Sequence, residues 1–400
     1  MRVKVLFLTI IITLLSCSND SDDTNDYNKL VTNPAYESPF DNDFTLKLVD
    51  SLNITTEARP NDYMNKDIFA DTLLFGNDWN EKNKIDVYDL KNKKFLKTIE
   101  IADYKVKNNF ASISVHSLDT ILIAYDYPPE FQFANFEGKI IKDIKLGDLK
   151  LTIDNPKAPK TDNYRLPIFN DKPIIYNNKL YFTITPMGVQ DLPGFKRVER
   201  IAIYDLKKDS LIKAVCPMKG PIALKGVFYL SQLMNPYFII NDNKLFVSYP
   251  IDHYIYEYDL DGNFIKKILA SASKLEKLPS PLKFDKRRDR EYVRDWWLPI
   301  PFYGPLSYHK QAQVYTRIFH QSQPLKMLNG ELNNGSKRDG YVLIYDKNFN
   351  KIGEVKFTNG RLGLYKVFPL SDGFLMAPNQ EHWTNENELI YKYVYKFKKN

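Results

Sequence analysis

Three histidines stand at equivalent places in a repeated pattern, each just after an alternating apolar stretch. They are His253 in YPIDHY, His320 in RIFHQS and His382 in NQEHWT. Neutral imidazoles bind transition metals, and a histidine beside a carboxylate can move protons in catalysis. Asp252 and Glu381 directly precede two of these histidines. The set could therefore bind a metal, carry out acid–base chemistry or line a polar groove, and we favour the groove.

Aromatic and cationic side chains near the same loops could also contact a ligand. Aromatic rings can stack on the ring of a sugar or peptide, and arginine binds carboxylates. The candidate ligand-binding residues are Trp79, Tyr127, Arg165, Asp252, His253, His320, Glu381, His382 and Trp383. The sequence has no Ser/His/Asp order with a nucleophile turn and no specific metal motif. Catalytic residues therefore stay unassigned, and we expect no metal and no other cofactor.

Two short phrases that recur six times must position these residues. One is a polar turn followed by an alternating apolar strand, as in LDTILIA from Leu118 and DNKLFVS from Asp242. The other is a hairpin whose turn is rich in Asp, Asn, Gly and Lys, as in IAIYDLKKDSLIKAV from Ile201. Together they predict four antiparallel strands per repeat.

Four-stranded units at this period indicate an all-β fold, a six-bladed β-propeller of four-stranded antiparallel blades. The early stretch FTLKLVDSLNI from Phe44 has no partner in its own repeat, and the last repeat lacks a strand. We therefore expect the N-terminal strand to complete the last blade and close the ring, so that residues 43–400 form one domain. An open β-sandwich pair or several small β domains are the alternatives.

Four of the hairpins carry a Tyr-Asp pair at the end of their first strand, at residues 88–89, 204–205, 258–259 and 345–346. We expect the tyrosine to pack between blades and the aspartate to start the turn by accepting backbone N–H groups. A ladder of calcium sites is the alternative. Calcium loops need several closely spaced oxygen ligands, which these turns lack.

The lengths of the connections differ between the two ends of the predicted ring. If the strands of a blade are a to d, the a–b and c–d turns lie at one end, the tight-turn end. The b–c and blade-to-blade connections lie at the other, the long-connection end. All long insertions belong to the second set, at 147–164, 186–200, 217–235, 271–305 and 321–339. Binding sites concentrate on such elaborated ends.

One insertion predicts a helix, in KFDKRRDREYVRDWW from Lys283 to Trp297. Tyr292, Val293, Trp296 and Trp297 form an apolar stripe at helical spacing. We expect this stripe to pack onto the rim of the propeller. If it is partly exposed, the tryptophan pair offers a stacking platform for a ligand.

The N-terminus predicts export and lipid attachment. Arg2 and Lys4 precede the apolar run VLFLTIIITLL, which suits a secretory signal, residues 1–16. The following LLSC resembles the lipobox of bacterial lipoproteins, and this resemblance implies that Cys17 is acylated and becomes the first mature residue. Residues 17–42 begin with an acidic, apolar-poor stretch and predict a flexible tether.

Composition and charge narrow the partners. With 44% hydrophobic residues, 27 Tyr and 25 Phe, the chain can bury a large core. The net charge falls from +7 to +5 when Arg2 and Lys4 leave with the signal, and the basic residues form no regular run with aromatics. We therefore expect no nucleic-acid partner. Cys216 is the only cysteine besides Cys17, so the mature chain has no internal disulfide.

The six hairpins and the N-terminus together resemble Bacteroidetes outer-membrane lipoproteins with a six-bladed TolB-like or NHL-like propeller, a type whose function is undefined. The acidic stretch behind Cys17 is similar to their surface-export signal, which favours the cell surface over the periplasmic face. We expect a lipid-anchored module of the outer membrane that binds a carbohydrate, a peptide or an envelope protein. The alternative is a propeller enzyme, a lyase or hydrolase, with a His/carboxylate site on the long-connection end.

Overall fold

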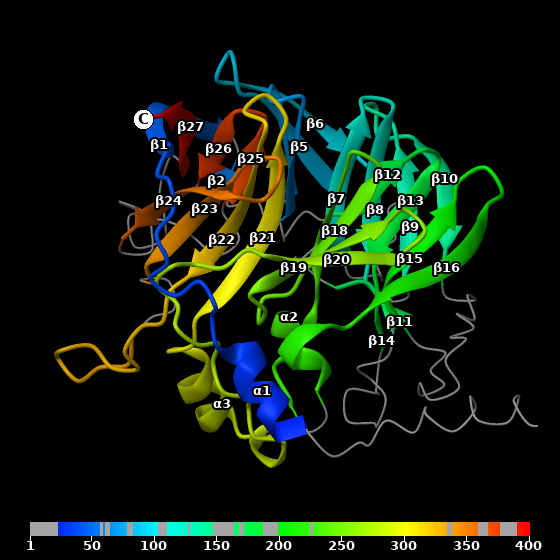
Figure 1. Cartoon of the computed structure of the whole chain (residues 1–400). Coiled ribbons are helices and arrows are strands. Elements are labelled where there is room, and N and C mark those ends of the chain that lie inside the picture. The colour runs from blue at the N-terminus through cyan, green and yellow to red at the C-terminus, as the bar shows by residue number, and fades with distance from the viewer. Residues whose placement is uncertain are drawn as a thin grey trace, which may run out of the picture.

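A computed structural model gives the architecture of the chain (Figure 1). It describes residues 23–56, 59–60, 65–77, 83–102, 110–126, 129–146, 164–167, 172–186, 199–224, 227–333, 338–358, 367–376 and 390–400. Six antiparallel sheets stand around a common axis, and each contributes at least four strands. The prediction of a six-bladed propeller is confirmed.

Blades 1 to 5 each use four strands that pair in sequence order, and only in blade 3 does another described strand, β14 (Thr185–Pro186), intervene in the chain. The first strands of neighbouring blades contact one another, β3 with β7 and β17 with β21, and so lie around the ring axis. The strands are β3 (Asn65–Phe69), β4 (Leu73–Asn77), β5 (Lys84–Asp89) and β6 (Lys94–Glu100) in blade 1; β7 (Phe110–Ser117), β8 (Thr120–Tyr125), β9 (Glu130–Ala134) and β10 (Ile140–Lys145) in blade 2; β12 (Ile174–Tyr176), β13 (Lys179–Thr183), β15 (Glu199–Asp205) and β16 (Ser210–Pro217) in blade 3; β17 (Tyr237–Asn241), β18 (Lys244–Ser248), β19 (Tyr254–Asp259) and β20 (Phe264–Leu269) in blade 4; β21 (Phe302–His309), β22 (Val314–His320), β23 (Gly340–Tyr345) and β24 (Lys351–Phe357) in blade 5.

Blade 6 joins the two ends of the chain. Its strands β25 (Val367–Leu370), β26 (Gly373–Met376) and β27 (Ile390–Lys399) come from the C-terminus, and β1 (Phe44–Thr56) pairs antiparallel with β27. The register runs from Phe44 opposite Lys399 to Ile54 opposite Ile390, with one irregularity near Asp50. A short strand, β2 (Arg59–Pro60), extends the sheet. The N-terminal strand therefore closes the ring, as the sequence predicts.

The core lies between neighbouring blades. Apolar side chains form separate buried clusters between blades 1 and 2, blades 2 and 3, blades 5 and 6, and blades 6 and 1, and one larger cluster joins blades 3, 4 and 5. For example, the rings of Phe131 in blade 2 and Phe182 in blade 3 meet edge to face at 4.9 Å. A single sheet cannot bury both of its faces, and this circle of clusters buries all six sheets at once.

The outermost strands are built to stay unpaired. In β6 and β20 the outward positions are largely exposed and carry lysines among the apolar residues. Charged side chains on an edge strand oppose pairing with another chain. The third strands are the opposite case, since every residue of β9 is buried and β15 has five consecutive buried residues.

The remaining elements all belong to the long-connection end and gather below the strands in Figure 1. They are α1 (Asp23–Val31), the strand pair β11 (Tyr164–Arg165) and β14 (Thr185–Pro186), the 3-10 turns η2 (Gly220–Ala223) and η3 (Phe284–Lys286), and the helices α2 (Ser231–Met234) and α3 (Arg290–Trp297). One end of the ring therefore carries folded elements beyond the strands.

Candidate functional site: the long-connection end

The tight-turn end is reduced to short hairpin turns. The first hairpins of blades 1, 3 and 4 turn through residue pairs with left-handed backbone, such as Asn177 and Asn178 at φ 49° and 58°. Asparagine and aspartate tolerate this conformation, which suits the twist of a two-residue hairpin. The longest turns at this end span only residues 135–139 and 346–350.

The Tyr-Asp pairs behave as the sequence predicts. Tyr258 is 1% exposed, and the Asp259 carboxylate accepts the backbone N–H groups of Asp261 and Asn263 and the side-chain amide of Asn263. Asp346 makes the same three kinds of contact in blade 5. These bonds lower the pKa of Asp259, with the side-chain amide of Asn263 as the largest cause. The carboxylate oxygens are thus engaged by the turn, which favours turn chemistry over calcium binding.

A helical layer covers blades 4 and 5 at the long-connection end, where α1, α2 and α3 gather (Figure 1). Tyr229 connects the segments of this layer. Its hydroxyl donates to the Pro279 carbonyl at 2.8 Å and lies 3.2 Å from the hydroxyl of Tyr27 on α1. The ring of Tyr229 also lies beside Trp296 of α3, at 6.1 Å between centroids. Both tryptophans of α3 are partly buried, and the indole N–H of Trp296 donates to the Ser280 carbonyl. The apolar stripe packs onto the rim, as expected.

The chain from Asp23 to Phe40 is part of this layer, which corrects the prediction of a free tether for residues 17–42. Asn33 is 4% exposed, and its side-chain amide donates to the carbonyls of Ala272 and Leu275, each at 2.8 Å. Backbone bonds link Leu278 to Val31 and Asn33 to Glu276. The prediction failed because it extended the acidic composition of the first residues over Leu30, Val31 and Asn33, which supply burial and hydrogen bonds. We call residues 23–42 the N-terminal arm.

Asp252 lies in the connection between β18 and β19 and is fully buried. Its carboxylate accepts the hydroxyl of Tyr256 at 2.6 Å and the backbone N–H of Tyr254 at 3.0 Å. Burial raises its pKa to about 6, although these bonds favour the charged form. Gly220 lies against it with φ +67°, and a Cβ there would lie 1.9 Å from the carboxylate. Asp252 is therefore bonded within blade 4 and packed against the connection that comes from blade 3.

His253 is also fully buried, and both of its ring nitrogens are used. Nε2 lies 3.0 Å from the Val31 carbonyl and Nδ1 lies 3.0 Å from the Tyr303 hydroxyl. A carbonyl only accepts, so Nε2 carries the proton and Nδ1 accepts from the tyrosine. Burial lowers the pKa of His253 to about 4, which keeps the ring neutral. This histidine holds the N-terminal arm on the ring.

Arg317 is a structural centre that the sequence analysis did not identify. It lies within β22, is fully buried, and donates to the carbonyls of Ala270, Tyr249 and Asp252 at 2.8–2.9 Å. Its guanidinium also lies 3.8 Å from the centre of the Tyr303 ring. The sequence VYTRIFH could have indicated a buried arginine, because a charged residue interrupts a largely apolar strand there. Every residue of that strand is buried in the structure.

His320 has a different setting from His253, since it is the last residue of β22, whereas His253 lies in the connection after β18. It is 1% exposed and stacks on Phe302 at 4.8 Å, and Trp297 of α3 stacks on the other side of Phe302 at 5.4 Å. Arg338 donates to the carbonyls of Ile300 and Leu298 and holds this stack in place. Burial lowers the pKa of His320 to about 3. The ring is a packed aromatic in this arrangement.

The structure therefore assigns packing roles to three of the nine candidate ligand-binding residues, Asp252, His253 and His320. The backbone of Arg165 pairs with Thr185 across β11 and β14, and its side chain lies outside the description. The other five candidates lie outside the described residues; they are Trp79, Tyr127, Glu381, His382 and Trp383. The predicted anchor Cys17 also lies outside them. Within the described part of the chain, no three His, Cys, Asp or Glu side chains are grouped so that they could hold a metal.

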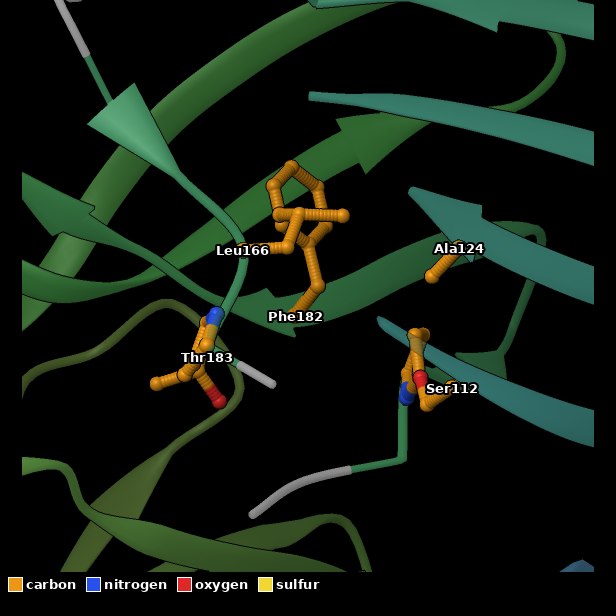
Figure 2. Close-up of a pocket in the computed structure, with 7 residues that line it drawn as sticks. Ser112, Ala124, Leu166, Phe182 and Thr183 are labelled. Atoms are coloured by element: carbon orange, nitrogen blue, oxygen red, sulfur yellow. The ribbon is translucent and has the colours of Figure 1, made fainter. Parts of the chain in front are cut away.

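A small pocket opens at this end between blades 2 and 3 (Figure 2). Its volume of about 10 Å³ is near the smallest that admits one water. Figure 2 shows Thr183 across the space from Ser112 and Ala124. The lining residues are Ser112, Ala124, Leu166, Pro167, Pro173, Phe182 and Thr183. This half of the long-connection end has a hollow, whereas the half over blades 4 and 5 is covered by helices.

Comparison with known proteins decides the family. The model of the domain of unknown function DUF4221 matches residues 55–356. The chain belongs to this family. A crystal structure of a DUF4221 member from Bacteroides vulgatus is similar over 90% of this chain and 99% of its own, with a TM-score of 0.68 at 15% identity. A candidate exported protein from Bacteroides fragilis is similar over 88% and 96%, with a TM-score of 0.54 at 11% identity.

These matches confirm the resemblance to Bacteroidetes propellers of undefined function. At such identities they establish the fold that this DUF4221 protein shares with them. No curated protein matches its sequence. None of the helices that the structure describes is long and apolar enough to cross a membrane.

Proposed function

We propose that this DUF4221 protein is a lipid-anchored binding module of the cell envelope, and that its long-connection end holds a carbohydrate or a peptide. The observation that carries the proposal is the contrast between its two ends. At one end the strands are joined by short turns, none longer than the turn of residues 135–139. The other end carries every helix and the extra strand pair of the described chain. Rings that carry a binding site show this contrast, because the loops of one end can change without disturbing the blades.

The half of this end over blades 2 and 3 is the better candidate for the ligand. The hollow between Ser112 and Thr183 has room for about one water, so a sugar or peptide would lie on the surface around it. Beside it, Lys172 reaches the carboxylate of Asp67 on the first strand of blade 1, and the lysine side chain stays 40% exposed. Partly exposed polar groups beside apolar side chains on one surface suit a ligand that offers both hydroxyl or amide groups and an apolar face.

The enzyme alternative has less support. A lyase or hydrolase site would use Asp252 and His253, and both are sealed from solvent and bonded to the fold. A catalytic base must reach the proton that it abstracts. Binding requires only a shaped surface, which the long-connection end provides.

Attachment to the outer membrane through Cys17, at the cell surface, is the second part of the proposal. It is supported by the signal-like N-terminus and by the similar protein from Bacteroides fragilis, whose name describes it as a candidate exported protein. Cells grown with labelled palmitate should incorporate label into the wild-type chain and into a Cys216→Ala variant, but not into Cys17→Ala. Equal labelling of all three would contradict acylation at Cys17.

Thermal-shift screening tests the binding proposal. The chain from Ser18 onward keeps every residue that the structure describes, so it can be mixed with glycans, peptides and divalent metals. A ligand that binds only the folded form raises the melting temperature in proportion to the logarithm of its concentration. We expect such a rise with a glycan or peptide. A rise with a divalent metal alone would favour a metal site instead.

A further inference from the structure

We propose that the long-connection end over blades 4 and 5 lies on the lipid surface, with the hairpin tip at Leu328 and the basic surface of η3 and α3 in contact with the headgroups. This inference adds an orientation to the proposed anchored module, and it rests in part on acylation at Cys17. It concerns the helix-covered half of this end and leaves the hollow over blades 2 and 3 for the ligand.

The place where the described chain begins is the first support. Helix α1 starts at Asp23, at the long-connection end and beside α3 in Figure 1. Asp23 is six positions after Cys17 in the chain. An extended chain spans at most about 3.3–3.6 Å per residue, so the start of α1 lies within roughly 20 Å of the acyl group. Because Asn33 and His253 fasten the N-terminal arm to the ring, the whole layer must stay close to the membrane.

The charge of the facing surface is the second support. Residues 274–295 contain eight Lys and Arg and five Asp and Glu. Lys283, Lys286, Arg288 and Arg290 are all exposed. Phe284 is 40% exposed among them, and the guanidinium of Arg287 lies 3.7 Å from the centre of its ring. Cations beside an exposed aromatic ring suit the interface of an anionic membrane.

An ordered hairpin with an apolar tip is the third support. It runs from Leu325 to Asn333 in the b–c connection of blade 5 and projects from the molecule in Figure 1 (golden). The backbone N–H of Met327 donates to the Glu331 carbonyl, and the N–H of Gly330 donates to the Met327 carbonyl. Gly330 takes the left-handed conformation with φ +84°. Leu328 at the tip is fully exposed, and Leu332 is 38% exposed. The fold therefore holds a leucine in solvent on a defined turn.

These three features favour a bilayer over a protein partner. The exposed leucine is a single projecting side chain, whereas protein interfaces bury broad patches of both partners. A projecting leucine can enter the headgroup region without a matching pocket, and the anchor keeps that region within reach. The same end thus offers a covalent anchor, a basic surface and an apolar tip to one membrane.

Lipid quenching of a fluorescent label tests the orientation. In the acylated chain Cys216 is buried, so a label goes to an introduced cysteine. The Leu328→Cys protein is compared with Lys347→Cys, an exposed residue in the opposite turn of the same blade. Both are placed on vesicles of phosphatidylethanolamine and phosphatidylglycerol that contain a brominated lipid. We expect strong quenching at position 328 and none at 347. Equal quenching at the two positions, or stronger quenching at 347, would overturn the proposal.

Vesicle flotation of the unacylated chain from Ser18 tests the surface without the anchor. We expect weak binding to the same vesicles, and this binding should fall at high salt. It should also fall about tenfold for Leu328→Asp, because the variant loses the favourable burial of the leucine.

The double variant Lys286→Glu, Arg288→Glu should also bind less than wild type. The control Lys207→Glu, Lys208→Glu has the same charge change at the tight-turn end and should bind as wild type. No binding by the wild type, or equal loss in both double variants, would refute the docking surface. Failure of palmitate labelling with intact flotation would refute only the anchor.

Discussion

The two ends of this propeller are made from the same strands, yet their polar groups find hydrogen-bond partners in different ways. At the tight-turn end the c–d hairpins of blades 4 and 5 satisfy their own backbone with a local aspartate, as Asp259 and Asp346 do. At the long-connection end, groups from distant parts of the chain satisfy one another, as His253 does for Val31 and Arg317 does for Ala270. The difference teaches that local turns make the ring robust, whereas the elaborated end depends on long-range polar contacts. Mutation and pH should therefore affect the two ends unequally.

Acidification should have the largest effect. His253 and His309 have pKa values lowered to about 4 and His320 to about 3, in each case because burial disfavours the charged ring. The unfolded chain binds these protons near pH 6.5, so stability is complete above that pH and falls as the pH drops towards 4. Asp252 opposes this trend, since its pKa is raised to about 6. Three groups against one predict a net loss, measured as the urea midpoint between pH 7 and pH 4.

A single variant separates the contribution of the two ends to this pH effect. His309 belongs to the tight-turn end, where it bonds the Leu370 carbonyl and the Thr316 hydroxyl. Its replacement, His309→Gln, should leave most of the pH dependence in place because His253 and His320 remain. A pH profile that becomes flat in this variant would contradict the assignment of the effect to the long-connection end.

Loss of Arg317 should be the next largest effect. The Arg317→Met variant leaves three buried carbonyls without their donor, and we expect the free energy of unfolding to fall by about 3 kcal/mol or more. Lys310→Met changes an exposed residue in the turn between β21 and β22, at the other end of the same strands, and should cost no more than about 0.5 kcal/mol. Urea denaturation measures both. Similar losses would remove the contrast between the ends.

Release of the N-terminal arm should be smaller. The Asn33→Ala variant loses two buried hydrogen bonds, and we expect a loss of about 2 kcal/mol together with faster hydrogen exchange in the arm. Asn28→Ala, on the exposed side of α1, is the matched control and should exchange as wild type. Unchanged exchange in both variants would mean that the arm is held by other contacts.

A tight turn should be the least sensitive. The Asp259→Ala variant loses bonds within one solvent-exposed turn, and we expect a loss below about 1 kcal/mol. Calcium should leave the melting temperature of the wild type unchanged, because the carboxylate already accepts three donors. A clear rise with calcium would revive the ladder of metal sites.

Much of the fold could be predicted from the sequence, because period, strand alternation and turn residues are local properties. They correctly placed the six blades, the closing strand at Phe44 and the packing of α3. The burial of a side chain, in contrast, depends on segments that are distant in the sequence. The position of His253 after a strand indicates the end of the ring on which it lies, but its burial depends on the N-terminal arm, which arrives from 222 residues earlier in the chain at Val31.

The candidate site was therefore predicted only in outline. Insertion lengths correctly predicted which end of the ring carries the helices and the extra strand pair, whereas Asp252, His253 and His320 are packed inside that end. Arg317 was missed because its role requires three carbonyls from two separate connections to converge on one guanidinium. No spacing along the chain records such a convergence.

Hydrogen exchange in the presence of a bound ligand tests the central claim most directly. A glycan or peptide that raises the melting temperature in the screen is added to the chain, and exchange is compared with that of the free protein. We expect protection in the connections of the long-connection end, on the side of blades 2 and 3, and none in the turns 177–178, 206–209 and 346–350. Protection confined to those turns would contradict the assignment of binding to the elaborated end.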